Sequence, residues 1–302
     1  MKRSDDCTRR EFLATAGSAV AGAVLAANAA RAVQEGQPAG VRFGVRGPFR
    51  ARSIRERALL LQRLGYQGIE LGDEFLDRPL DSIKAELAGT GIEVSAIVGS
   101  LKLLDTDPRV RAEAIELDRR RLEMAKELGA SGVIEVPIFG PNRFQDLSPI
   151  MTPREIEDRL LVAALQQLAP DVARTGVNIL IEPLTKKETH YLNLQSHGVE
   201  IIKAVAASGF KLLSDFYHMQ MEEKDIAETL AACGAYTGYV HLADGVKRTE
   251  PGSLRFDYRP GFWALKNAGF AGWLTVESGA TDNPEAALTR ALKYIKQQRN
   301  EA

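Results

Sequence analysis

Eight short apolar runs alternate along the chain with longer segments of helical periodicity, and this alternation constrains the fold more than any other feature. Short runs rich in β-branched or apolar residues and bounded by Gly, Pro and Asp are typical of buried strands. The expected strands are Val41–Val45, Gly68–Leu71, Glu93–Val98, Gly132–Val136, Asn178–Glu182, Lys211–Ser214, Gly238–Leu242 and Trp273–Glu277. The expected helices are Ser53–Leu64, Leu80–Gly89, Val110–Leu128, Pro153–Arg174, Ser196–Ala207, Lys224–Cys233, Phe262–Ala268 and Pro284–Gln298.

Regular alternation of strand and helix favours parallel βα units. Eight such units predict closure into a (β/α)8 TIM barrel, an α/β fold with a single domain of about 250 residues. A doubly wound open sheet is the alternative, but the first expected strand is not followed by the glycine-rich G-x-G-x-x-G turn that dinucleotide-binding sheets carry. We therefore expect the barrel.

The N-terminus has the features of an export signal. Arg9 and Arg10 form a twin-arginine pair, and residues 14–30 that follow are small and apolar. This segment resembles the signals of the route that exports folded proteins, and we predict a twin-arginine-type signal peptide at residues 1–32. The stretch is rich in Ala and Gly, which makes it a poor membrane span. We expect a periplasmic or otherwise extracytoplasmic protein, and leave open whether the signal is cleaved or kept as a tether.

The remaining chain divides into a short linker and one domain. Residues 33–40 are rich in Gly, Pro and Gln, which is typical of a loose linker, and residues 41–302 are the expected TIM-barrel catalytic domain. The formal net charge of the whole chain is −1, and it becomes −3 when the five basic and three acidic residues of positions 1–32 are removed. Nucleic-acid-binding proteins carry clustered basic residues, so this balance argues against such a partner.

Four expected strands in the second half of the chain deliver a side chain that can bind a metal ion. These side chains are Glu182, Asp215, His241 and Glu277. Because every strand of a barrel opens its carboxyl end onto the same face, they are expected to converge. Three carboxylates and one imidazole suit a hard divalent cation with open coordination positions, whereas a structural zinc site would use more sulfur. The plainer alternative is that Glu182 and Glu277 are solvated carboxylates at the barrel rim.

Three sequence blocks in the second half carry a resemblance to a known family. The blocks are Glu182-Pro183-Leu184 with Glu188, Ser214-Asp215-Phe216-Tyr217-His218-Met219-Gln220 with Glu222, and His241-Leu242-Ala243-Asp244 with Arg248 and Glu250-Pro251-Gly252. Together they resemble the xylose isomerase-like TIM barrel superfamily of sugar phosphate isomerases and epimerases. The most similar members are the hydroxypyruvate isomerases and the ketose 3-epimerases. The resemblance is best from about Val177 to Glu277.

The resemblance implies an isomerase that depends on one divalent metal ion. Glu182, Asp215, His241 and Glu277 would bind Mn2+, Mg2+ or Co2+, with Zn2+ disfavoured. The implied reaction is the isomerisation or epimerisation of a small ketose or keto-acid through a cis-enediolate. Such a reaction removes and returns a proton next to a carbonyl, and Glu182 and Glu277 are the implied acid/base pair.

Three further residues are implied to bind the substrate, and each has a plainer alternative. His218 would contact a substrate oxygen, or else is a packed loop histidine. Arg248 would hold substrate oxygens, or else is a solvated loop charge. Glu188 would lie near Glu182, or else pairs on the surface with one of the two lysines before it. Other residues are expected only to line the pocket or pack in the core, namely Phe43, Glu70, Trp263 and Trp273, and a structural role is expected for His190 and His197.

Other functions on the same scaffold remain open. An exported lyase or dehydratase acting on 3-keto sugars or 3-keto glycosides would use the same proton abstraction and then expel a neighbouring group. A non-catalytic sugar-binding barrel would require a disabled site. A DNA-repair endonuclease of the related apurinic-site class is disfavoured, because it needs a multi-metal cluster and this chain has four histidines. The expected partner is a small carbohydrate or keto-acid, and a homo-oligomer remains open.

Overall fold

Eight parallel strands close into a barrel in the order of the sequence, each pairing with the next and β8 pairing with β1. The structure is a computed structural model that describes residues 40–50 and 53–302, and the predicted signal peptide and nearly all of the predicted linker lie outside these residues. The strands are β1 (Arg42–Gly47), β2 (Gly68–Leu71), β3 (Glu93–Val98), β4 (Gly132–Glu135), β5 (Asn178–Ile181), β6 (Phe210–Asp215), β7 (Thr237–Leu242) and β8 (Trp273–Glu277). The predicted barrel is confirmed.

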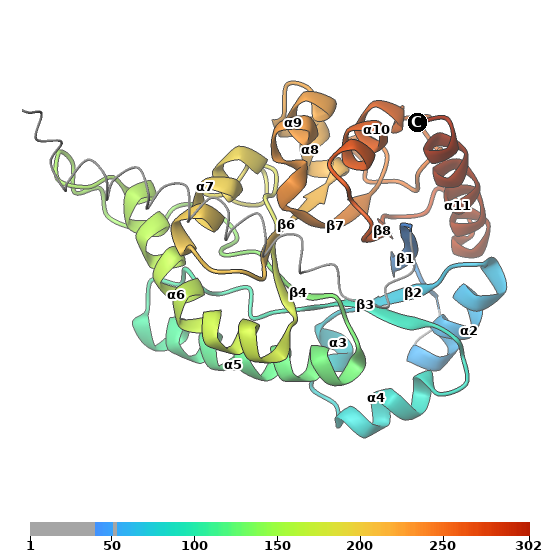
Figure 1. Cartoon of the computed structure of the whole chain (residues 1–302), viewed down its shortest axis with the longest axis horizontal. Coiled ribbons are helices and arrows are strands. Elements are labelled where there is room, and N and C mark those ends of the chain that lie inside the picture. The colour runs from blue at the N-terminus through green and yellow to red at the C-terminus, as the bar shows by residue number, and fades with distance from the viewer. Residues whose placement is uncertain (1–39, 51–52) are drawn as a thin grey trace, which may run out of the picture. The chain divides into compact units, whose positions relative to one another are not determined.

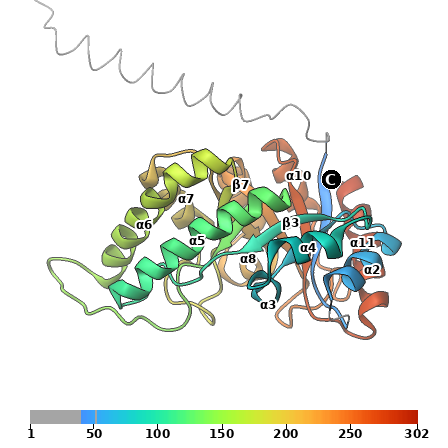
Figure 2. The same ribbon diagram turned by 90° about the horizontal axis from the view of Figure 1, so that it is seen from below.

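Helices surround the strands (Figure 1). They are α2 (Ile54–Leu64), α3 (Asp73–Leu76), α4 (Leu80–Leu87), α5 (Pro108–Leu128), α6 (Pro153–Thr175), α7 (Gln195–Val205), α8 (Phe216–Glu222), α9 (Ile226–Cys233), η1 (Gly234–Tyr236), α10 (Arg259–Asn267) and α11 (Pro284–Asn300). The longest two, α5 and α6, lie side by side (Figure 2). Within the part of the chain that the structure describes, no helix combines the length and the apolar character needed to cross a bilayer.

Local signals set the helix ends. Ser53 caps α2 by accepting a hydrogen bond from the backbone N–H of Glu56, and the Glu56 side chain accepts from the Ser53 N–H in return. The same helix ends at Gly65, whose φ of 85° is a left-handed conformation that glycine adopts without strain. The eight helices expected from the sequence form, with ends that shift by up to three residues, whereas the short elements α3, α8 and η1 were not expected.

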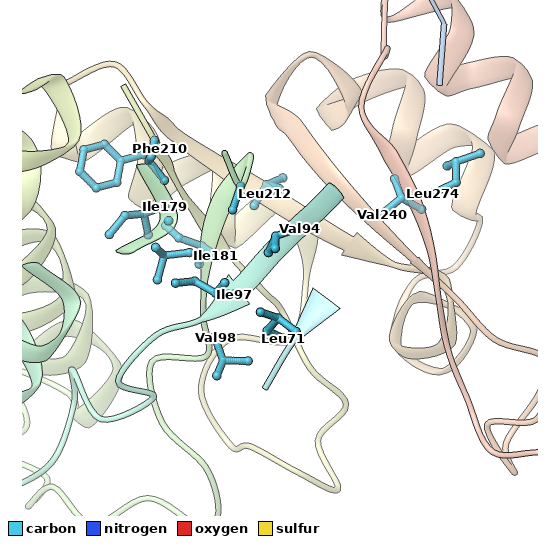
Figure 3. Packing of buried hydrophobic residues seen from close by; sticks show 14 of the residues in the cluster. Leu71, Val94, Ile97, Val98, Ile179, Ile181, Phe210, Leu212, Val240 and Leu274 are labelled. Carbon is cyan, nitrogen blue, oxygen red and sulfur yellow. The ribbon is translucent and has the colours of Figure 1, made fainter. Parts of the chain in front are cut away.

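Two separate apolar clusters show which strand residues face inward. One contains residues of six strands and no helix residue, so it lies inside the barrel: Ala96, Ile134, Leu180, Leu213, Tyr239 and Trp273. The other contains strand residues, of which Figure 3 labels Ile179, Ile181 and Leu212 among others. It also contains helix residues, so it lies between the strands and the helices. Because side chains alternate along a strand, the residue two positions after an inward-facing one also points inward. This alternation directs the side chains at the strand ends toward the barrel axis.

A buried pair of carboxyl groups lies outside the barrel wall, between β3, β4 and α5. Glu135 at the end of β4 and Asp118 on α5 are both fully buried. The backbone N–H of Ser100 donates to Asp118 Oδ1 at 2.7 Å and to Glu135 Oε1 at 2.6 Å. Burial raises the pKa of Asp118 to about 6, and burial together with the neighbouring Asp118 raises the pKa of Glu135 well above its usual range. The pair is therefore stable only when it holds a proton.

This pair makes the stability of the protein depend on pH. Because the folded pKa of Asp118 is raised, its favourable contribution is complete below about pH 4 and is lost as the pH rises through about 6. Asp118→Asn keeps an acceptor for the Ser100 N–H. We expect its free energy of unfolding to exceed that of the wild type, and we expect this excess to grow by about 1–3 kcal/mol from pH 5 to pH 8. Urea unfolding at both pH values measures this difference. The same difference at pH 5 and at pH 8 would contradict the conclusion that the Asp118–Glu135 pair holds a proton. The control is Glu93→Gln, at the exposed end of β3.

Candidate active site

Four side chains meet at the carboxyl ends of β5 to β8. Glu182, Asp215, His241 and Glu277 each offer one ligand-type atom, and these atoms all lie within 4.8 Å of one another. Three of them follow the inward-facing residues of their strands by two positions, as the alternation requires. Glu182, Asp215 and His241 are buried, whereas the Glu277 side chain is 27% exposed. The structure thus brings together the four residues that the sequence predicted as metal ligands.

The donor atoms of this cluster fit a cation. The buried atoms Glu182 Oε1, His218 Nε2 and His241 Nδ1 have no hydrogen-bond partner in the described chain. His241 Nδ1 lies 2.8 Å from Glu277 Oε2 and 3.4 Å from Glu182 Oε1, but without the geometry of a hydrogen bond. Buried polar atoms are nearly always paired. Carboxylate oxygens and one imidazole nitrogen gathered at one point, two of them buried without a hydrogen-bond partner, are the set that a hard divalent ion binds.

A carboxylate on the opposite side of the barrel orients the histidine of this cluster. Glu70 is the last residue of β2 whose side chain points into the barrel, and its Oε2 lies 2.7 Å from His241 Nε2. The Glu70 side chain is 1% exposed. In the neutral ring this hydrogen bond places the proton on Nε2, because the carboxylate can only accept, and the Nδ1 lone pair then faces the cluster, as binding to a metal ion requires. Histidines that bind metal ions commonly donate their other ring N–H to a carboxylate in this way.

The electrostatic environment separates the two glutamates. Burial raises the pKa of Glu182 above its ordinary value, although His241 opposes this shift. Burial would also raise the pKa of Glu277, but His241 and the guanidinium groups of Arg248 and Arg46 outweigh it and hold that pKa below the ordinary value. Burial lowers and the carboxylates of Glu70 and Glu277 raise the pKa of His241, and the carboxylates dominate. The two glutamates therefore differ in their readiness to hold a proton.

Arg248 lies in the cluster and is not a solvated loop charge. Its Nη2 donates to Asp215 Oδ2 at 2.7 Å and also to Glu277 Oε2, and its Nε donates to the backbone oxygen of Glu277 at 3.3 Å. The guanidinium lies over the Tyr217 ring, 4.6 Å from its centroid. Its φ of 51° is left-handed, which is costly for a residue with a side chain. The loop after β7 therefore holds Arg248 in a fixed and strained position.

Hydrogen bonds within that loop explain how the position is maintained. Asp244 accepts from the backbone N–H groups of Gly252 and Leu254, each at 2.9 Å, and from the Tyr258 hydroxyl at 2.7 Å. The fully buried Glu250 accepts from the N–H and the hydroxyl of Thr281 in the loop after β8. Both carboxylates belong to the sequence block that resembles the family. Their role here is to shape the loop.

His218 follows Asp215 on α8 and is almost fully buried. Its Nδ1 accepts a hydrogen bond from the backbone N–H of Thr185 at 3.1 Å, so the ring proton is on Nε2. That nitrogen lies 3.4 Å from Asp215 Oδ2 and 3.9 Å from Glu182 Oε1. The histidine is therefore packed, and it also directs a proton donor without a hydrogen-bond partner into the cluster.

Glu188 lies beside His218, at the mouth of the cluster. Its Oε1 is 3.9 Å from His218 Nδ1, and its side chain is 35% exposed. Lys186 pairs with Glu222 at 3.3 Å and not with Glu188. The surface pairing offered as the plainer alternative is thus not made with Lys186, and Glu188 remains close enough to reach a molecule bound over the cluster.

Comparison with known proteins agrees with the fold. Residues 59–298 match the model of the family described as xylose isomerase-like TIM barrel. The chain belongs to this family. The 3-dehydro-D-guloside 4-epimerase of Escherichia coli (strain K12) is 27% identical over 82% of the chain and 96% of the relative. A putative hydroxypyruvate isomerase of Streptomyces coelicolor is 26% identical over 77% of the chain and 88% of the relative.

Among solved structures, D-allulose 3-epimerase from Methylomonas sp. in complex with D-allulose superimposes with a TM-score of 0.73 and 26% identity. The match covers 86% of the present chain and 98% of that chain. These relatives of the xylose isomerase-like barrel are named epimerases and isomerases. They confirm the expected enzyme class, and they confirm the resemblance to hydroxypyruvate isomerases and ketose epimerases.

Residues with expected packing roles have mixed outcomes in this xylose isomerase-like barrel. Trp273 lies in the inner core, as expected, whereas Trp263 on α10 is 57% exposed. His190 pairs with Glu157 at 2.6 Å, so its expected structural role is supported. Glu70 was expected only to line the pocket or pack in the core. Glu70 and His241 are 171 positions apart in the sequence and meet only because the barrel closes, so no local sequence pattern predicts their contact.

Proposed function

We propose that the chain is a divalent-metal-dependent epimerase or isomerase that acts on a ketose or a keto-glycoside through a cis-enediolate. The observation that carries this proposal is the cluster of Glu182, Asp215, His241 and Glu277, whose ligand-type atoms all lie within 4.8 Å of one another. Two of these atoms, Glu182 Oε1 and His241 Nδ1, are buried and have no hydrogen-bond partner in the part of the chain that the structure describes. A divalent ion held there would polarise the substrate carbonyl and stabilise the negative charge that develops beside it.

The two glutamates are suited to move the proton. Glu182 directly follows β5 and Glu277 is the last residue of β8, so the two carboxylates approach the centre of the cluster from different strands. An epimerisation takes a proton from a carbon next to the carbonyl on one face and returns a proton on the other face. One carboxylate would accept the proton and leave the enediolate, the other would then donate a proton to the opposite face, and both would be within reach of the same carbon. Isomerisation needs the same two groups, with the proton returned to the neighbouring carbon.

The remaining polar groups are suited to hold substrate oxygens. Arg248 presents a guanidinium that is 25% exposed beside Glu277, and His218 presents its Nε2 proton beside Asp215. Donors fixed in advance lose little entropy when they bind a polyol, so they orient the reacting carbon between the carboxylates. Glu188 at the mouth can accept from a hydroxyl group.

The relatives support a sugar as the substrate. The Escherichia coli relative is named for a 3-dehydro-D-guloside, which is a keto-glycoside, and this name favours keto-glycosides as one substrate class for the present chain. A lyase acting on the same class would begin with the same proton abstraction and differ in its product. A non-catalytic sugar-binding role is disfavoured because the cluster is complete. The twin-arginine pair Arg9-Arg10 supports an extracytoplasmic location for the reaction.

Proton exchange in heavy water tests the proposal. The full chain, depleted of metal and reloaded with Mg2+, Mn2+ or Co2+, is incubated with ketoses, hydroxypyruvate and 3-keto glycosides and followed by NMR, with Mg2+ for the spectra. We expect metal-dependent uptake of deuterium at a carbon next to the carbonyl of at least one compound. The structure of the product then separates an epimerase or isomerase from a lyase. Bound metal without exchange in any compound would overturn the proposal.

A further inference from the structure

Arg46 occupies an irregular position at the end of β1. In the pairing of β1 with β8, Val45 lies opposite Val276 and Gly47 lies opposite Glu277, so Arg46 has no counterpart on β8. An extra residue of this kind is a β-bulge, which bends the strand and re-aims a side chain, and bulges are frequent next to active sites. The bulge places Arg46 directly beside the strand position of Glu277.

A glycine leaves the space in which the Arg46 guanidinium lies. A Cβ atom on Gly72, just after β2, would be 2.0 Å from Arg46 Nη1 and 2.7 Å from Arg46 Cζ. No side chain larger than hydrogen is compatible with this position of the guanidinium. Two carboxylates hold it from the sides, since Nε lies 3.3 Å from Glu70 Oε1 and Nη1 lies 3.9 Å from Glu74 Oε2.

Carboxylates pair with the Arg46 guanidinium, but its N–H donors have no hydrogen-bond acceptor among the described residues. Within residues 40–50 and 53–302, Arg46 makes ion pairs but no hydrogen bond, although its side chain is only 27% exposed. A guanidinium has five N–H donors, and in a partly buried site these normally find acceptors. Arg46 and Glu277 are each 27% exposed, and Gly47, the residue after Arg46, lies opposite Glu277 in the strand pairing, so both groups are accessible at this end of the barrel. None of the Arg46 nitrogen atoms is both buried and unpaired within the described residues, so water can accept from them in the free protein, and a sugar oxygen bound beside the candidate base can take the place of that water.

The charges around Arg46 indicate the kind of acceptor. Burial lowers its pKa, but the carboxylates of Glu70, Glu277 and Glu74 raise it more, so Arg46 stays cationic. These three carboxylates already offset the charge of the guanidinium, so little of it is left to attract an anionic group. A neutral hydroxyl or carbonyl oxygen needs only the N–H donors of the guanidinium and not its net charge.

We propose that Arg46 is a substrate-binding residue, which donates hydrogen bonds to a neutral oxygen of the sugar beside Glu277 and thereby favours neutral sugars over anionic keto-acids. This proposal rests on the proposed function and specifies its substrate class. Arg46 acts from β1, on the side of Glu277 away from the pairing with β7, whereas Arg248 acts from the loop after β7.

Substitutions at Arg46 and Gly72 test this assignment independently. Arg46→Lys keeps the charge but loses the planar array of donors, and Gly72→Ala keeps the arginine but displaces its guanidinium. We expect each to weaken sugar binding by about tenfold or more, which is the typical value of a hydrogen bond to a charged group, with unchanged metal content. Arg42→Lys is the matched control, because Arg42 lies on the same strand at the other end of the barrel and pairs with Glu93.

The readouts are the Kd of D-allulose and of a methyl 3-keto-glucoside from ligand-observed NMR with the Mg2+-loaded protein, together with KM, kcat and deuterium exchange. If both variants keep the wild-type Kd and KM, and the wild type binds and exchanges, the proposed role of Arg46 is wrong and the proposed function still stands. Binding without exchange in the wild type would overturn the proposed function alone, because the Kd values still test Arg46. Hydroxypyruvate binding more tightly than either sugar, or no binding of either sugar, would overturn the assignment of neutral sugars.

Discussion

Glu277→Gln is expected to lower the rate of turnover by about 10²- to 10⁴-fold, the range that a positioned general acid or base contributes, while the fold is retained. Glutamine has nearly the shape of glutamate, and its amide oxygen can still accept from Arg248, which donates to Glu277 at present. It cannot accept a proton from carbon at neutral pH. Deuterium exchange on the substrate found for the wild type measures the loss, and circular dichroism measures the fold.

Metal content separates the two roles of Glu277. If the variant keeps its metal and loses exchange, the carboxylate acts as the base, whereas a parallel loss of metal shows that it is needed as a ligand. Glu93→Gln is the control, because Glu93 is an exposed glutamate on a barrel strand at the end away from the cluster. Unchanged turnover in Glu277→Gln would remove the two-glutamate mechanism.

Glu70→Gln is expected to weaken metal binding by roughly 10- to 100-fold, as is typical when the carboxylate behind a ligating histidine is lost. The Glu70 carboxylate accepts from His241 Nε2 at 2.7 Å, which holds the ring with Nδ1 toward the other ligands. A glutamine can present its NH2 group to the ring, and His241 would then favour the tautomer with the proton on Nδ1. Titration of the metal-depleted chain with Mn2+ or Co2+ by calorimetry measures the affinity.

Nitrogen chemical shifts of His241 in the Mg2+-loaded protein provide a second measurement of the same effect. The wild type is expected to show the proton on Nε2, and the variant a mixture of tautomers. Glu93→Gln again serves as the control, since it removes a carboxylate that contacts Arg42 and no histidine. Wild-type affinity together with an unchanged tautomer in Glu70→Gln would show that Glu70 does not orient the ligand.

Most of the barrel and the cluster could be predicted from local sequence. The strands are short apolar runs, and the ligands stand at their ends, where the topology of the fold brings separate segments together. The helix α8, which the sequence did not predict, begins directly after Asp215. Asp215 is the last residue of β6, and its side chain caps the helix by accepting from the Tyr217 N–H at 2.8 Å. Without a loop or glycine between the two elements, the sequence offered no boundary signal.

The supporting groups could not be predicted in the same way. Glu70 is one acid in a four-residue strand, and its function depends on a partner that only barrel closure brings into contact. Arg46 depends on a bulge in the pairing of β1 with β8, and Gly72 matters only because that bulge directs the guanidinium toward it. Pairing irregularities follow from the three-dimensional register of two strands that are more than 200 residues apart, so they leave no pattern in either strand alone.

The origin of the site residues divides the chain into two halves with different evolutionary freedom. The candidate ligands, His218 and Arg248 all come from β5 to β8 and the loops that follow them, whereas β1 and β2 supply Arg46 and Glu70. On the proposed mechanism, drift in the second half would destroy the reaction, whereas drift at the end of β1 would change which molecules are accepted while the reacting groups survive. A lineage of such barrels could therefore acquire new substrates through its first strand, and a mutant library aimed at new substrates is best confined to the end of β1, because Glu70 at the end of β2 supports His241.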